Sequence, residues 1–336
     1  MFNSRSVFYL FIAIFAFSCK KDNEKPEEPV ACNSTNITAS DTFALLFVTK
    51  EGTNLAIHQL KNGIETSLIS DPQYDFWWPK FSPSKQEILC YRSPGNDLTE
   101  LNDFAQAELW KFNFDGTGGH MILKLSDYGW NATGYAQWSP DGKKIVMSAS
   151  NEDAADNNVV HWHLYVTDTA GNNAQKISNR SSYFSYPDIS PDFTKITYCA
   201  YPSPIQTGTA FETELHIATL DTATWVMSSE VRVTNNTRAE EHSNYSADGL
   251  SIVFYSYSGN NDFSLHTSTF TGGTITNIAT GGRYMSQPVF RNSNEIFFVL
   301  RYGSMCLNYI ARSNEAGSNE LPYYRRLNQH FYHPEL

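Results

Sequence analysis

The chain has 336 residues, of which 41% are hydrophobic, 14% are aromatic and only 18% are charged. This is enough apolar material for a sizeable core, which excludes a chain that is disordered throughout. The 35 acidic residues outnumber the 24 lysines and arginines and give a net charge of −11. An acidic chain lacks the basic footprint of nucleic-acid-binding proteins, so we expect no nucleic-acid partner.

An apolar run covers residues 7–17, follows a single basic residue, Arg5, and ends just before Ser18 and Cys19. About a dozen apolar residues are too few to span a bilayer but suit the central region of an export signal. A charged stretch with two prolines follows Cys19 directly. This pattern resembles a bacterial lipoprotein signal of the relaxed Bacteroidetes type, although Leu is absent three residues before Cys19. The resemblance implies that Cys19 is lipidated. An ordinary cleaved signal with an incidental cysteine is the alternative.

We therefore divide the chain into a signal peptide (residues 1–18), a lipidated cysteine with a flexible tether (19–40) and a repeat region (41–336). No other segment approaches about 18 uninterrupted apolar residues, so we expect membrane contact only through the lipid anchor. The resemblance implies a place in the outer membrane, on its periplasmic or cell-surface side. Cys90 and Cys199 lie in apolar strand patterns and are expected to be buried free thiols. The sequence leaves open whether Cys32 or Cys306 forms a disulfide.

A short motif recurs along the repeat region: an aromatic or polar residue, a proline or small residue, two further residues and an S-P-D-G turn. Four copies begin at Trp78, Tyr135, Tyr186 and His242, and a degenerate fifth copy begins at Gln287. In the first four copies an isoleucine stands six residues after the serine and opens a β-rich run. Proline and glycine suit the turn between two strands. Two further strands follow in each repeat, so the sequence predicts four strands per unit, as in a propeller blade.

The motif resembles the repeat of TolB-type β-propellers, which also occurs in the propellers of dipeptidyl-peptidase-type enzymes. This implies an all-β propeller of four-stranded blades over residues 41–336. The proline-equivalent positions are 79, 136, 187, 243, 288 and 334, which predicts six blades. Residues 331–336 would then be the first strand of the N-terminal blade and close the ring, the alternative being a tail that happens to contain His-Pro. Such propellers include scaffolds, binders and enzymes, so the fold alone implies no single function.

Candidate binding residues follow from the repeat, because one face of a propeller carries both the second-to-third-strand loops and the connections between blades. Three of these loops are long, at residues 92–107, 150–160 and 202–211. The residues just before the proline-equivalents, together with Glu241, form an expected set at the channel mouth. Its members are Trp78, Tyr135, Tyr186, Glu241, His242, Gln287 and His333. Flat rings beside a few polar groups can stack on sugars or clamp a peptide. The alternative is that the aromatic residues fill the gaps between blades.

Signatures of catalysis are weak. The sequence has no G-x-S-x-G elbow, no hydrolase domain after the propeller and no phosphate-binding glycine loop. The pair His161 and His163 and the acidic loop 151–158 do not favour a metal site, so no metal or other cofactor is expected. Glu240, Glu241 and His242 are the most suggestive candidates for an acid–base cluster. We therefore expect a non-catalytic binding or scaffolding protein whose partner is an oligosaccharide or an envelope protein. A glycan lyase or hydrolase acting at the channel mouth is the alternative.

Overall fold

The computed structural model describes residues 37–38, 41–95, 103–151, 161–180, 182–202, 212–258, 262–280, 284–301, 308–317, 320–325 and 330–336. Cys19 and the predicted signal peptide lie outside these ranges. The helical elements within them are two single-turn 3-10 helices, η2 (Phe104–Gln106) and η3 (Leu125–Asp127). None of the described helices is long and apolar enough to cross a membrane.

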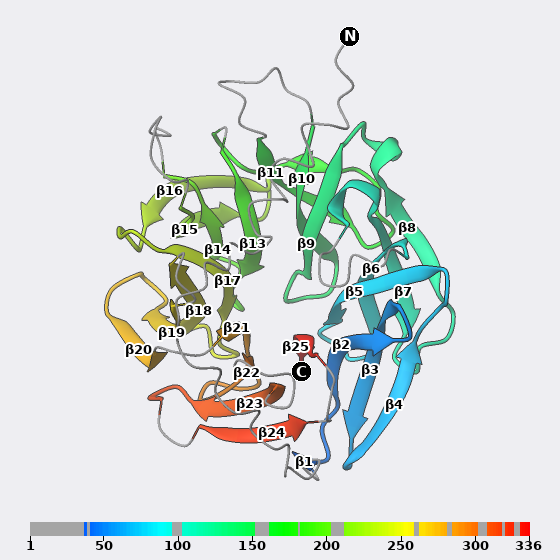
Figure 1. The fold of residues 1–336 in the computed structure, drawn as a ribbon. Coiled ribbons are helices and arrows are strands. Elements are labelled where there is room, and N and C mark those ends of the chain that lie inside the picture. Colours follow the sequence, from blue (N-terminus) through cyan, green and yellow to red (C-terminus); the bar gives the residue numbers. More distant parts are fainter. Residues whose placement is uncertain are drawn as a thin grey trace, which may run out of the picture. The chain divides into compact units, whose positions relative to one another are not determined.

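The strands form six antiparallel sheets, which are the blades of a propeller (Figure 1). Blade 1 consists of β25 (Tyr332–Glu335), β2 (Leu45–Glu51), β3 (Asn54–Lys61) and β4 (Ile64–Ile69). Blade 2 consists of β5 (Tyr74–Phe81), β6 (Glu87–Pro94), β7 (Glu108–Asn113) and β8 (His120–Lys124). Blade 3 consists of β9 (Ala132–Trp138), β10 (Lys144–Ser150), β11 (Trp162–Asp168) and β12 (Gln175–Lys176).

The second half of the ring repeats the pattern. Blade 4 consists of β13 (Phe184–Ile189), β14 (Lys195–Ala200), β15 (Glu214–Asp221) and β16 (Val226–Arg232). Blade 5 consists of β17 (Ala239–Tyr245), β18 (Ser251–Ser258), β19 (Asp262–Thr269) and β20 (Ile275–Thr280). Blade 6 consists of β21 (Tyr284–Phe290), β22 (Glu295–Arg301), β23 (Asn308–Asn314) and β24 (Leu321–Arg325).

The last strand closes the ring, as the sequence predicts. β25 pairs antiparallel with β2, with Leu46 opposite Glu335 and Val48 opposite Tyr332. Just before β25, the fully buried Phe331 ring lies 5.5 Å from the ring of Phe47 in blade 1 and 5.4 Å from that of Tyr324 in blade 6. The C-terminal residues therefore join the first blade to the last, and Figure 1 shows β25 at the inner edge of blade 1.

The S-P-D-G segments form the turns between first and second strands. In blade 3 the Ser139 hydroxyl donates to Asp141 Oδ1 (2.7 Å) and accepts from the Lys144 N–H (2.9 Å). Gly142 then takes φ +69°, and Lys85 and Phe193 adopt the same left-handed conformation in blades 2 and 4. The serine–aspartate bond is repeated in blades 4 and 5. These side-chain bonds replace the backbone partners that the tight turn leaves unpaired, which explains why the motif recurs.

One short strand lies outside the repeat pattern, and two cysteines lie within it. A short strand, β1 (Ile37–Thr38), pairs with the outer edge of β24, so blade 6 has a fifth strand. This strand lies inside the segment that the sequence predicts to be a flexible tether. Cys90 in β6 and Cys199 in β14 are free and buried, as expected from their apolar surroundings.

Candidate functional site

Six side chains converge on the propeller axis from the same position in each blade. They are Trp78, Tyr135, Tyr186, His242, Gln287 and His333, and we call them the axial ring. Each has a positive φ, between 48° and 60°. At each of them the register between first and second strand shifts, which marks a β-bulge. Positive φ is uncommon for residues other than glycine, so a sixfold occurrence indicates a built feature of the fold.

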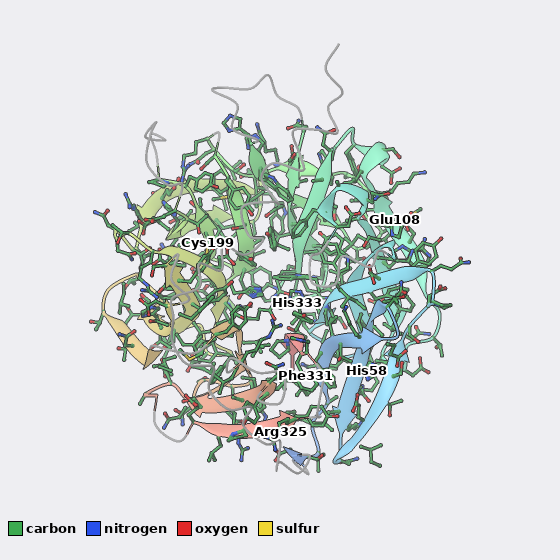
Figure 2. The ribbon with its side chains drawn as sticks, viewed as in Figure 1. His58, Glu108, Cys199, Arg325, Phe331 and His333 are labelled. Carbon is green, nitrogen blue, oxygen red and sulfur yellow. The ribbon has the colours of Figure 1, made fainter. Side chains whose placement is uncertain are left out.

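The axial ring fills the axis. The Trp78 ring contacts four others, at centroid distances of 4.8 Å to His242, 4.9 Å to His333, 5.4 Å to Tyr135 and 5.7 Å to Tyr186. Its indole N–H donates to the Ala136 carbonyl (2.8 Å). Gln287 Oε1 accepts from the His333 backbone N–H (2.7 Å). Figure 2 shows His333 near the centre of the ring of blades. The sequence predicts that these residues lie at a channel mouth. In the structure they pack against one another across the axis.

The two histidines of the axial ring are neutral at neutral pH. Burial, assisted by nearby Lys80 and Arg301, lowers the pKa of His333 to about 3. Burial also holds the pKa of His242 well below its usual range, assisted by His333 and Lys80. Neutral imidazoles can be accommodated in an aromatic cluster without a counter-ion.

On one side of the axial ring, toward the S-P-D-G turns, lies a set of paired polar groups; we call this end the turn face. Lys80 Nζ lies 2.9 Å from Glu335 Oε2, and both side chains are nearly buried. Asp188 accepts from the Tyr245 N–H (2.7 Å) and from Gln137 Nε2 (3.4 Å), and burial raises its pKa to about 6. Lys80 and Gln137, together with Trp78 and His333 of the axial ring, line a cavity of about 20 Å³, which suits one water molecule.

The other side of the axial ring faces the ends of the second strands, which lead into the long loops; we call this end the long-loop face. Here the Glu241 carboxylate accepts from the hydroxyls of Tyr186 (2.9 Å), Tyr257 (3.2 Å) and Tyr255. Burial raises the pKa of Glu241, and the three hydroxyls act in the opposite direction. Nearby, the hydroxyls of Tyr135 and Tyr183 lie 3.2 Å apart. We call Glu241 with Tyr186, Tyr255 and Tyr257 the Glu241 cluster.

The adjacent residues Glu240, Glu241 and His242 do not form one catalytic group. Glu240 points into the junction of blades 4 and 5, where it accepts from Asn236 Nδ2 and from the Thr234 hydroxyl, both at 2.9 Å. Burial, with the nearby Glu214, raises the pKa of Glu240 to about 8. His242 belongs to the axial ring, and only Glu241 faces the tyrosines. Neighbouring strand residues point to opposite faces, so sequence adjacency here does not bring the side chains together.

Other candidates of the sequence have structural roles. His163 lies within blade 3, buried, with Nδ1 3.2 Å from the Ser178 hydroxyl. In the part of the chain that the structure describes, no three His, Cys, Asp or Glu side chains are grouped to hold a metal. The acidic loop is described only at Asn151.

Sequence reasoning missed two groups of residues. Tyr255 and Tyr257 come from a second strand, β18, whereas the motif that marks the axial residues lies in the first strands. The paired residues of the turn face stand two positions after the axial ring in the repeat, at Lys80, Gln137, Asp188 and Glu335. The same repeat alignment could have found this second set, because positions two apart on a strand point to one side.

Comparisons with known proteins extend the fold assignment. No family model and no curated protein sequence matches the chain. Solved structures do match. TolB from Acinetobacter baumannii aligns with a TM-score of 0.65 and 13% identity, over 89% of this chain and 67% of its own. A chain of a nidogen/laminin complex aligns with a TM-score of 0.62 and 8% identity, over 87% of this chain and 98% of its own. An oligogalacturonate lyase in complex with manganese aligns with a TM-score of 0.55 and 13% identity, over 86% of this chain and 77% of its own.

These neighbours are too distant in sequence to carry more than the fold. They include binding proteins and enzymes, in agreement with the varied functions of this architecture. The blade number, the S-P-D-G turns and the structural neighbours agree with one another. The chain therefore has the six-bladed β-propeller fold that is also found in TolB.

Proposed function

We propose that this propeller is a non-catalytic binding protein of the cell envelope, anchored through a lipid on Cys19, whose ligand docks on the long-loop face. The observation that carries the proposal is the Glu241 cluster, in which a carboxylate and three tyrosine hydroxyls meet at one end of the axis. Aromatic side chains with a polar tip are common at binding surfaces.

The filled axis supports docking at this end rather than passage through the propeller. Trp78 lies across the axis against four other rings, so a ligand on the long-loop face meets a floor of packed aromatic residues. Glu241, Tyr186 and Tyr257 lie at this end of the axis and are only half-buried. Loops set on a rigid scaffold are a common place for binding.

Site-specific crosslinking in cells tests the docking face. A photo-reactive benzoylphenylalanine is placed at Tyr257 and, as a matched control on the turn face, at Lys143, whose side chain is 80% exposed. We expect a defined crosslinked product from position 257 and none from position 143. Equal crosslinking from both positions, or from 143 alone, would contradict docking on the long-loop face.

Ligand class and catalysis are tested together. The purified mature protein is incubated with a panel of oligosaccharides, with and without Mn²⁺, while its melting temperature and the reaction products are followed. Stabilisation without new products is the expected result if the ligand is a glycan. New products that require the protein would instead favour the lyase or hydrolase alternative.

The anchor has its own test. Cys19 follows the apolar run directly, and two or more acyl chains hold a protein stably at a membrane. We expect mass spectrometry of the mature protein to find a lipid-modified cysteine as its first residue, and Cys19→Ala to leave the protein outside the membrane fraction. An unmodified N-terminus downstream of Cys19 would show that the signal is an ordinary cleaved one.

A further inference from the structure

We infer that the Glu241 cluster receives an organic cation, namely the ammonium or guanidinium group of a lysine or arginine side chain presented by a partner protein. This inference rests on the proposed function, because it names the chemistry of the ligand at the same face. It is carried by three observations: the lack of a cation beside Glu241, the direction of the tyrosine hydroxyls, and the aromatic wall next to them.

Glu241 differs from three other carboxylates of the propeller interior that have cationic partners, whereas Asp188 and Glu240, like Glu241, accept hydrogen bonds from neutral groups. Glu335 pairs with Lys80 at 2.9 Å and Glu230 with Arg180 at 2.8 Å. Glu214 pairs with Arg232. Within the described ranges, Glu241 forms no ion pair, and all its hydrogen bonds come from neutral hydroxyls. A desolvated carboxylate without a counter-ion is costly, and a cationic ligand would remove that cost.

The hydroxyls make the site an acceptor for further hydrogen bonds. A phenol has one O–H, and in Tyr186, Tyr255 and Tyr257 that O–H is directed to the carboxylate. Their remaining lone pairs, like those of the carboxylate, can only accept. The cluster therefore offers several acceptor oxygens and no free donor of its own. A group with several N–H donors and a positive charge, such as an ammonium or guanidinium, complements it.

Aromatic rings continue from the cluster toward blade 6. Tyr255 and Tyr257 stack at 6.1 Å, Phe263 lies 5.6 Å from Tyr257, and Tyr284 lies 4.6 Å from Phe263. Ring faces attract cations and also pack against the apolar stem of a lysine or arginine side chain. An oligosaccharide without charge would use the rings but leave the carboxylate unpaired. This difference favours a basic side chain over a neutral sugar.

The charge of the whole molecule agrees with a basic partner. The net charge of −11 attracts positively charged proteins over distances of about a Debye length, roughly 8 Å at physiological salt. Such attraction raises the rate of encounter, while the Glu241 cluster would determine where the cationic side chain binds.

Binding of two small peptides to the mature protein, followed by NMR titration, tests the inference. The probes are acetyl-Gly-Lys-Gly-amide and the same peptide with its lysine Nε acetylated, which keeps the length and removes the charge. We expect the acetylated peptide to bind at least about tenfold more weakly, since hydrogen bonds to charged groups contribute about 1.5–3 kcal/mol. Equal affinity of the two peptides would overturn the inference without any variant.

Variants locate the effect. Glu241→Gln keeps the side chain's shape and should reduce affinity for the lysine peptide about tenfold. Glu87→Gln, which removes a carboxylate paired with Lys111 on the turn face, should leave the affinity unchanged. If Glu87→Gln weakens binding as much as Glu241→Gln, the effect is one of net charge and the inference is wrong.

The two proposals fail in distinguishable ways. Crosslinking from Tyr257 that persists in Glu241→Gln, together with equal peptide affinities, would keep the docking face and refute the cation. Loss of crosslinking in Glu241→Gln, with the charged peptide preferred, supports both. Absence of crosslinking from Tyr257 refutes the docking face, and peptide binding that is insensitive to Glu241 then refutes the cation site as well.

Discussion

The two ends of the propeller axis each contain a glutamate and, among the described residues, only the glutamate of the turn face has a cationic partner. On the turn face, Lys80 and Glu335 pair at 2.9 Å, and Asp188 has two hydrogen-bond donors. On the long-loop face, Glu241 has three hydroxyls but, in the described structure, no cation. Glu241 and Glu335 both come from first strands. In the repeat, Glu241 stands one position before the axial residue and Glu335 stands two positions after it. A paired charge joins parts of the fold, whereas a charge without a counter-ion is kept at the expense of stability, as is common at binding sites.

The largest expected effect comes from removing the strand that supplies Glu335. Deleting residues 329–336 removes β25, exposes the edge of β2 and leaves Lys80 without its partner. Burial of Phe331 alone contributes about 1.5–3 kcal/mol. We expect an aggregating or largely unfolded protein in chemical denaturation and circular dichroism, whereas deletion of residues 20–31 should leave the melting temperature nearly unchanged. Two deletions with the same melting temperature would refute ring closure as a source of stability.

A single substitution isolates the charge pair of the turn face. Glu335→Gln leaves the Lys80 ammonium nearly buried beside a neutral side chain. Breaking a buried pair on one side costs about 3–5 kcal/mol, so urea denaturation should show a loss of this size. The double variant Lys80→Met with Glu335→Leu should recover much of it, because both charges are then absent. A double variant no more stable than Glu335→Gln would mean that packing, and not the unpaired charge, causes the loss.

The histidines between the two ends should make the protein sensitive to acid. Because the pKa of His333 in the folded protein, about 3, lies below its ordinary value of 6.5, its contribution to stability is complete above pH 6.5. That contribution is lost as the pH falls toward 3, by a few kcal/mol in total. His333→Gln places at this position the residue that blade 6 already has there, Gln287. The melting temperature of this variant should fall less between pH 7 and pH 4 than that of the wild type. An equal fall in both proteins would contradict a lowered pKa of His333 as the cause.

The smallest effect concerns Glu241 and has the opposite sign to that of Glu335. Because burial raises the pKa of Glu241, its stability contribution is complete below pH 4.5 and declines as the pH rises through the pKa of the folded state. Glu241→Gln should therefore melt roughly 1–3 °C higher than the wild type at pH 8, and at the same temperature at pH 4. Destabilisation at pH 8 would indicate that the carboxylate is part of the fold's own support.

The repeat made much of this architecture predictable. The S-P-D-G-type turns and the isoleucine that follows them give the first two strands of blades 2 to 5, because turn chemistry and strand patterning are local properties. The role of residues 331–336 as a first strand was also predictable. His333 and Pro334 match the axial residue and the proline that follows it in three other blades, such as Trp78 and Pro79. The pairing of β1 with β24 was not, because a two-residue strand at the outer edge leaves no periodic pattern.

The candidate site shows where such prediction ends. Its first-strand members were found by counting back from the proline-equivalents, and the structure brings these residues together at the axis. Counting could not show that Trp78 lies across the axis, or that Glu240 and Glu241 face different neighbours. Tyr255 and Tyr257 come from another strand, and their approach to Glu241 depends on how β17 and β18 pair.

The amino-acid sequence by itself determined the blade number, the turns and the residues that would point to the axis, because each depends on short-range chemistry that recurs along the chain. Only the tertiary structure decided which axial charges are paired. Lys80 and Glu335 are 255 positions apart in the chain, and they meet because closure of the ring brings β25 beside β5. Glu241 meets tyrosines instead of a cation because the strands around it supply only hydroxyls there. Both outcomes depend on which blades become neighbours, and that is a property of the closed ring.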